Sequence, residues 1–152
     1  MLALIRPDSW NFPLFLHVLG AMTLVGCLVT AALAVVLGWR RDAVALTRVA
    51  FRTLLLGALP SYVVMRIGAQ WVYSREGFSG NIDQTWVAIG FITADAGALL
   101  LLISILLTGL AVRRLRRAEA QTSALGRVGG VITLILVVAY VVAIWAMTTK
   151  PT

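Results

Sequence analysis

The sequence predicts an all-α protein, built as a bundle of four transmembrane helices. Of its 152 residues, 61% are hydrophobic and only 12% are charged, whereas a soluble domain carries about 25% charged residues. The mean hydropathy is +0.95. This composition excludes a water-soluble globule and a disordered chain. The apolar residues also gather into four runs of spanning length, separated by short polar connections.

Each run is long enough to cross a bilayer, whose core of about 30 Å needs about 20 apolar residues in helical form. We expect spans over residues 13–38, 50–73, 86–112 and 128–147, with tryptophans near their ends at headgroup level. Because the connections leave no room for a soluble domain, residues 1–152 are predicted to form one membrane domain.

Two of the spans have special features. The first carries small residues at four-residue spacing, which favour close helix packing: Gly26, Thr30, Ala34 and Gly38. The second contains Pro60, which removes a backbone hydrogen bond and is expected to kink the helix.

The basic residues predict the orientation. Four arginines lie in the connection after the first span and the first turn of the second, and five lie in the connection after the third, against three basic residues on the other side. Since basic loops stay in the cytoplasm, we expect both termini to be extracytoplasmic. The net charge of +7 then reflects topology rather than a nucleic-acid partner. Size and composition are typical of a multi-pass protein of a bacterial plasma membrane.

Three ionisable residues lie at least one full turn inside the ends of the predicted spans: His17, Arg66 and Asp95. A rise of about 1.5 Å per residue places all three in the outer half of the membrane. The second and third spans are joined by a short loop and run antiparallel, so Arg66 can reach Asp95.

Further polar residues accompany this pair. Tyr62, Arg66 and Gln70 recur every four residues and share one helix face. We expect Tyr62, Arg66, Gln70, Asp95 and His17 to form a buried, outward-facing polar cluster that binds a small ligand or a partner subunit.

Several alternatives remain open for this cluster. Arg66 and Asp95 can serve only to neutralise each other and hold two helices in register. A proton-coupled transporter would use Asp95 as the proton carrier, and two copies of the chain would build its pathway. A third alternative assigns haem or copper to His17.

No motif typical of an enzyme is present, neither a glycine-rich phosphate loop nor a nucleophile elbow, an HExxH sequence or a carboxylate pair. The chain is therefore expected to be non-enzymatic. One cysteine and one histidine exclude an internal disulfide and a His-rich metal site within one chain. The partners we expect are the lipid bilayer and a second copy or another membrane subunit.

The stretch Leu14-Phe15-Leu16-His17-Val18-Leu19-Gly20-Ala21 resembles the first helix of the copper resistance D type and related bacterial integral membrane proteins. The resemblance implies a helical membrane bundle and assigns His17 as a ligand of copper or haem. Because His17 is the only histidine, a bis-histidine haem site would need two chains, and a site in one chain would need methionine as the other ligand.

Overall fold

The computed structural model describes residues 11–39, 43–75, 85–118 and 124–149. These residues are helical almost throughout, which confirms the all-α class. The helices are α1 (Asn11–Gly38), α2 (Ala43–Arg52), the π-helical segment η2 (Thr53–Ala58), α3 (Leu59–Arg75), α4 (Thr85–Ala118) and α5 (Ala124–Thr149).

The chain has four helices that are long and apolar enough to cross a membrane, where the second is the continuous run of α2, η2 and α3. Each contains one of the spans predicted above and extends beyond it. The helix of the third span continues to Ala118 and ends in arginines, which are good helix formers and interact favourably with the negative end of the helix dipole. Both termini lie outside the described residues, and the orientation stays a prediction.

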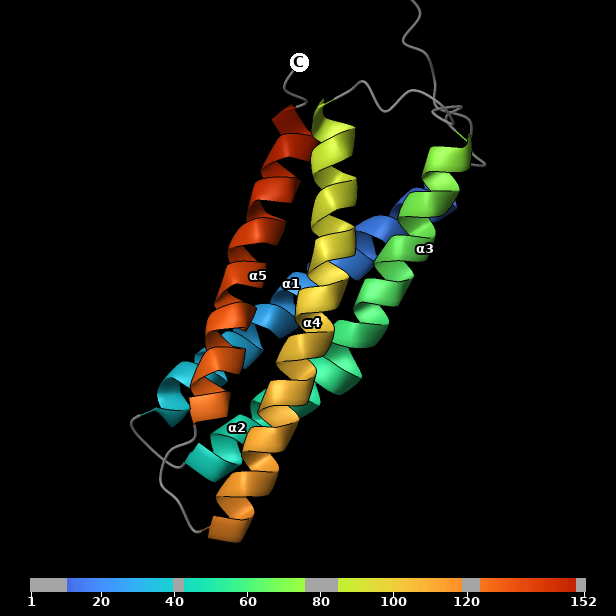
Figure 1. The fold of residues 1–152 in the computed structure, drawn as a ribbon. Helices are drawn as coiled ribbons and strands as arrows, with labels where there is room; N and C mark the ends of the chain where they lie inside the picture. Colours follow the sequence, from blue (N-terminus) through green and yellow to red (C-terminus); the bar gives the residue numbers. More distant parts are fainter. Residues whose placement is uncertain (1–10, 40–42, 76–84, 119–123, 150–152) are drawn as a thin grey trace, which may run out of the picture.

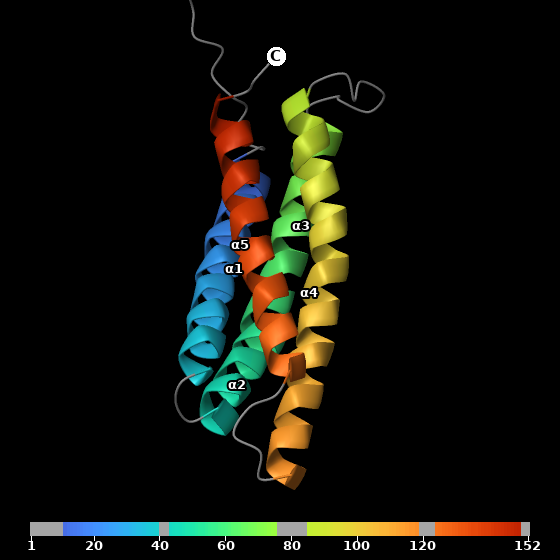
Figure 2. The same cartoon turned by 60° about the vertical axis from the view of Figure 1, so that its left-hand side comes forward.

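The helices form two closely packed pairs (Figures 1 and 2). One pair is α1 with α3 and the other is α4 with α5, and α1 also packs against α5. At one end of the bundle α2 lies against α4, whereas α3 and α4 draw apart toward the other end and make few contacts. The bundle is therefore packed on every side except between α3 and the N-terminal half of α4.

The contact between α1 and α3 depends on two glycines. A Cβ atom at Gly20 would lie 2.5 Å from the backbone nitrogen of Met65, and one at Gly68 would lie 2.5 Å from that of His17. Both positions thus bring backbone against backbone, where any side chain would collide. Of the four small residues predicted to favour close packing of the first span, only two are buried. Ala34 and Gly38 are buried, whereas Gly26 and Thr30 are exposed.

The contact between α4 and α5 contains a buried hydroxyl cluster. Ser104, Thr108 and Thr133 are 0% exposed. The oxygens of Ser104 and Thr133 are 2.7 Å apart, and both hydroxyls lie within hydrogen-bond distance of the Gly129 carbonyl. Because side-chain hydrogen bonds between membrane helices contribute about 0.6 kcal/mol each on average, this cluster stabilises the pair.

The helix runs on through Pro60. Just before it, where η2 ends, the backbone N–H of Leu59 donates to the carbonyl of Leu54, five residues back. Proline offers no N–H, and its ring collides with the carbonyl four residues earlier in a regular α-helix. The wider π turns accommodate that collision, so the expected distortion takes the form of a π segment within a continuous helix.

We predict that Gly20→Ala destabilises the protein whereas Gly26→Ala on the same helix does not. The new methyl group at residue 20 meets the backbone of α3, and such overpacking costs about 1–3 kcal/mol. At residue 26 nothing lies within 4 Å, and the change gains helix propensity of up to about 1 kcal/mol. Thermal unfolding in detergent compares the two, and equal stability of both variants would contradict the close contact.

Candidate polar site between α3 and α4

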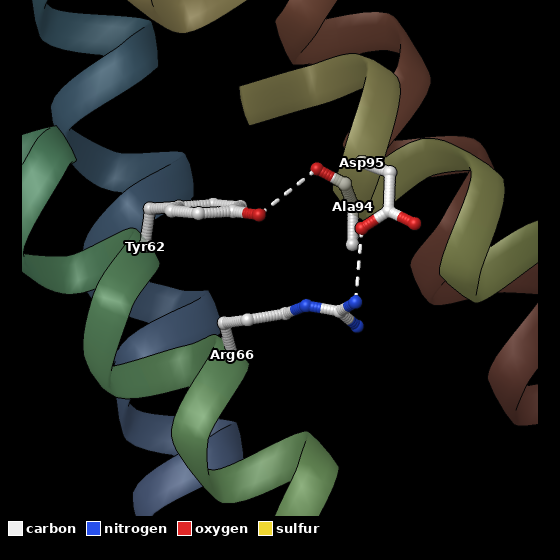
Figure 3. A network of polar contacts seen from close by, with 4 residues as sticks. All are labelled: Tyr62, Arg66, Ala94 and Asp95. Atoms are coloured by element: carbon white, nitrogen blue, oxygen red, sulfur yellow. Dashed lines mark hydrogen bonds and ion pairs between the residues drawn. The ribbon is translucent and has the colours of Figure 1, made fainter. Parts of the chain in front are cut away.

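An ion pair joins α3 to α4. Arg66 Nη2 donates to Asp95 Oδ1 over 2.9 Å (Figure 3). One turn earlier on α3, the hydroxyl of Tyr62 donates to the backbone carbonyl of Ala94 over 3.1 Å. Because Tyr62 and Arg66 are four residues apart, they project from one face of α3. They therefore reach two consecutive residues of α4.

Aromatic rings extend this contact. The guanidinium carbon of Arg66 lies 4.9 Å from the centre of the Phe91 ring, within the range of a cation–π interaction. Phe91 in turn meets Tyr73 edge to face, with ring centres 5.2 Å apart. The guanidinium thus contacts a carboxylate and an aromatic face at once, and both contacts come from α4.

The pair is accessible, which corrects the expectation of a buried cluster. The side chain of Arg66 is 29% exposed and that of Asp95 is 65% exposed. The physical cause is the fold: α3 is drawn against α1 at Gly20 and Gly68, and so α3 and α4 do not pack closely around the pair.

The structure does not join His17 to the pair. Its Nδ1 lies 3.1 Å from the carbonyl oxygen of Met65, in the contact between α1 and α3. Since a carbonyl only accepts, Nδ1 carries the proton, and the electron pair of the neutral ring is on Nε2. Gln70 is exposed and, within the described ranges, forms no hydrogen bond with Tyr62, Arg66 or Asp95.

Metal binding finds limited support in the geometry. Nε2 is the nitrogen that a metal or haem iron would use, because histidine ligands commonly donate their other N–H to a carbonyl. However, no group of three or more His, Cys, Asp or Glu side chains that could hold a metal ion lies within the described part of the chain. The assignment of copper or haem to His17 stays a prediction.

Tyr140 on α5 is a buried polar residue that was not predicted from the sequence. Tyr140 is 5% exposed, and its hydroxyl is buried without a hydrogen-bond partner among the described residues. It packs against Gly97 of α4, where a Cβ would lie 2.7 Å from the hydroxyl oxygen, and belongs to the core cluster against which Tyr62 packs. A hydroxyl in the middle of the most apolar span was the signal that could have revealed it.

A double-mutant cycle tests whether Arg66 and Asp95 stabilise the bundle jointly. We expect Arg66→Met and Asp95→Asn each to lower the free energy of unfolding by about 1–3 kcal/mol, because each leaves a charge without its partner. The double variant should recover about 0.5–2 kcal/mol, in the range of side-chain coupling between membrane helices. Chemical unfolding in detergent measures all four proteins, and strictly additive losses would show that the two side chains do not interact.

Comparisons with family models, curated proteins and solved structures gave no match to this chain. The resemblance of the first helix to the copper resistance D type therefore stays a prediction. What the site does must be argued from its own geometry.

Proposed function

We propose that this chain is a non-enzymatic integral membrane protein in which Tyr62, Arg66 and Asp95 bind a small ligand between α3 and α4. In this proposal both termini are extracytoplasmic, so the ligand binds in the outer half of a bacterial plasma membrane. The four apolar helices are compatible with an integral membrane protein.

The exposure of Asp95 is the observation that carries the proposal. A charged residue at the middle of a membrane helix costs about 2.5–3.5 kcal/mol on insertion scales. A purely structural pair would lower this cost by burial between α3 and α4, but 65% of the Asp95 side chain is uncovered. A polar group that covers Asp95 would remove the contact between charge and lipid. The free energy gained when Asp95 is shielded from lipid therefore favours binding of such a group.

The geometry indicates which groups of the ligand would bind. One carboxylate oxygen of Asp95 accepts from Arg66, and the other points away from it (Figure 3). This second oxygen accepts hydrogen bonds and therefore suits a ligand with hydroxyl or N–H donors. The ring of Phe91, which lies against the guanidinium of Arg66, and the ring of Tyr73 offer an apolar surface next to the pair. An amphipathic molecule that enters from the lipid fits both features.

A partner subunit is the rival occupant, because a polar side chain of another helix would cover Asp95 equally well. The two occupants differ in mass. A small ligand adds a few hundred daltons to the chain at most, whereas a partner adds a whole polypeptide.

Native mass spectrometry of the purified protein tests the proposal. We expect the wild-type chain to carry a small bound molecule that is absent from the Arg66→Met/Asp95→Asn double variant, in which no charge is left unpaired. Gly26→Ala is the matched control and should keep it. A wild-type spectrum without such a molecule, or one that the double variant retains, would refute ligand binding at this site. An added polypeptide in its place would assign the site to a partner subunit.

A further inference from the structure

A second charged surface lies at the opposite end of the bundle from the ion pair. We call it the arginine end. Seven described arginines make it up: Arg48, Arg52, Arg113, Arg114, Arg116, Arg117 and Arg127. The described residues contain a single acidic side chain, Asp95, and it already pairs with Arg66. Asp42 and Glu119, which border α2 and α4 in the sequence, lie outside the described residues. Within the described ranges, no carboxylate pairs with an arginine of this end.

The packing of α2 on α4 places two of these arginines at one level. A Cβ at Gly109 would lie 2.9 Å from the ring of Phe51, so this ring rests on α4. Arg48 is one turn before Phe51 on the same face of α2. Because α4 runs opposite to α2 (Figure 1), moving back one turn on α2 corresponds to moving forward one turn on α4. One turn after Gly109 on α4 is Arg113, so Arg48 and Arg113 lie at the same level of the bundle.

Arg48 differs from a free surface arginine. It is half-buried, and its Nε atom is buried without a hydrogen-bond partner in the described part of the chain. The stem is therefore packed against its neighbours, which restricts the orientation of the guanidinium group. Such a preorganised fork loses less conformational entropy when it binds a planar carboxylate or a phosphate.

The four arginines of α4 provide the charge around this fork. Arg113, Arg114, Arg116 and Arg117 are all exposed, and α4 continues past the ends of α2 and α5 (Figures 1 and 2). In a bilayer, the segment that follows the apolar part of a span lies among the lipid headgroups. In the headgroup region, the guanidinium groups of these arginines lie next to lipid phosphates.

We propose that the arginine end binds the phosphate groups of anionic phospholipids between α2 and α4. The positive-inside bias requires only that the connections carry positive charge. It does not explain why the stem of Arg48 is packed, nor why Arg48 lies at the same level of the bundle as Arg113. Phosphate oxygens would accept from the guanidinium groups and offset the repulsion among them. This proposal does not depend on a ligand at the Arg66–Asp95 pair.

Lipid retention in nanodiscs tests the proposal. The protein is placed in equal parts of phosphatidylcholine and phosphatidylglycerol, and native mass spectrometry measures the ratio of the two lipids retained. We expect phosphatidylglycerol to be enriched on the wild-type chain. Arg113→Gln and Arg48→Gln should each reduce this enrichment about fivefold, the ratio that corresponds to about 1 kcal/mol per charge near a membrane surface.

Arg75→Gln is the matched control, because it removes one charge from an exposed arginine at the other end of the bundle. It should leave the enrichment unchanged. Arg113 is exposed, so its variant reports on binding even where Arg48→Gln folds poorly. Absence of enrichment on the wild-type chain, or an equal loss in Arg75→Gln, would overturn the proposal. Displacement of the lipid by inorganic phosphate at matched ionic strength would do so too, because it would assign the surface to a free anion.

Discussion

The contact of backbone against backbone between α1 and α3 is the constraint on which the rest of the arrangement depends. Gly20 and Gly68 leave no room for a side chain where the two helices cross, and the ring of His17 donates to the Met65 carbonyl in the same contact. α3 is therefore held by α1. A different face of α3, which carries Tyr62 and Arg66, meets α4 across a looser contact.

The two sides of α4 differ in how they are stabilised. Toward α5, the contact is stabilised by buried hydroxyls and by the close approach of Gly129 to Thr108. Toward α3, two hydrogen bonds and a stacked arginine are the main links. Apolar packing contributes little on that side, so the free energy that holds α3 to α4 is small compared with the other contacts. A contact of this kind can admit a third group at little cost in lost packing.

The features that follow from helical periodicity could be predicted from the sequence. The four apolar runs gave four helices, and the four-residue spacing of Tyr62 and Arg66 put both on the face toward α4. Features that depend on how helices choose their neighbours could not be predicted. Gly20 and Gly26 look alike in the sequence, and only the crossing with α3 makes the first buried and leaves the second exposed. The exposure of Asp95 likewise follows from the choice of neighbours, because α3 packs against α1 and makes few contacts with α4.

The polar cluster was predicted around the ionisable residues Arg66, Asp95 and His17, which is why neutral groups that do not share a helix face with one of them were overlooked. Ser104, Thr133 and Tyr140 carry no charge, so their insertion costs are low and a mean hydropathy does not reveal them. Only the position of a hydroxyl group within an apolar span marks them. Their burial depends on the pairing of α4 with α5. The hydroxyl of Tyr140 shows that such a group can be buried without a hydrogen-bond partner among the residues that the structure describes.

Chemical labelling of α4 tests most directly whether the Arg66–Asp95 pair faces an open side of the bundle. In a Cys27→Ala background, single cysteines replace Asp95, Leu99 and Leu101, and a lipid-permeant maleimide is added to the protein in nanodiscs. Leu99 is 62% exposed and Leu101 is 1% exposed, so they provide the two reference rates. The structure predicts that a cysteine at residue 95 reacts as fast as one at residue 99. Reaction at residue 95 as slow as that at residue 101 would contradict it and would show that α3 and α4 close over the pair.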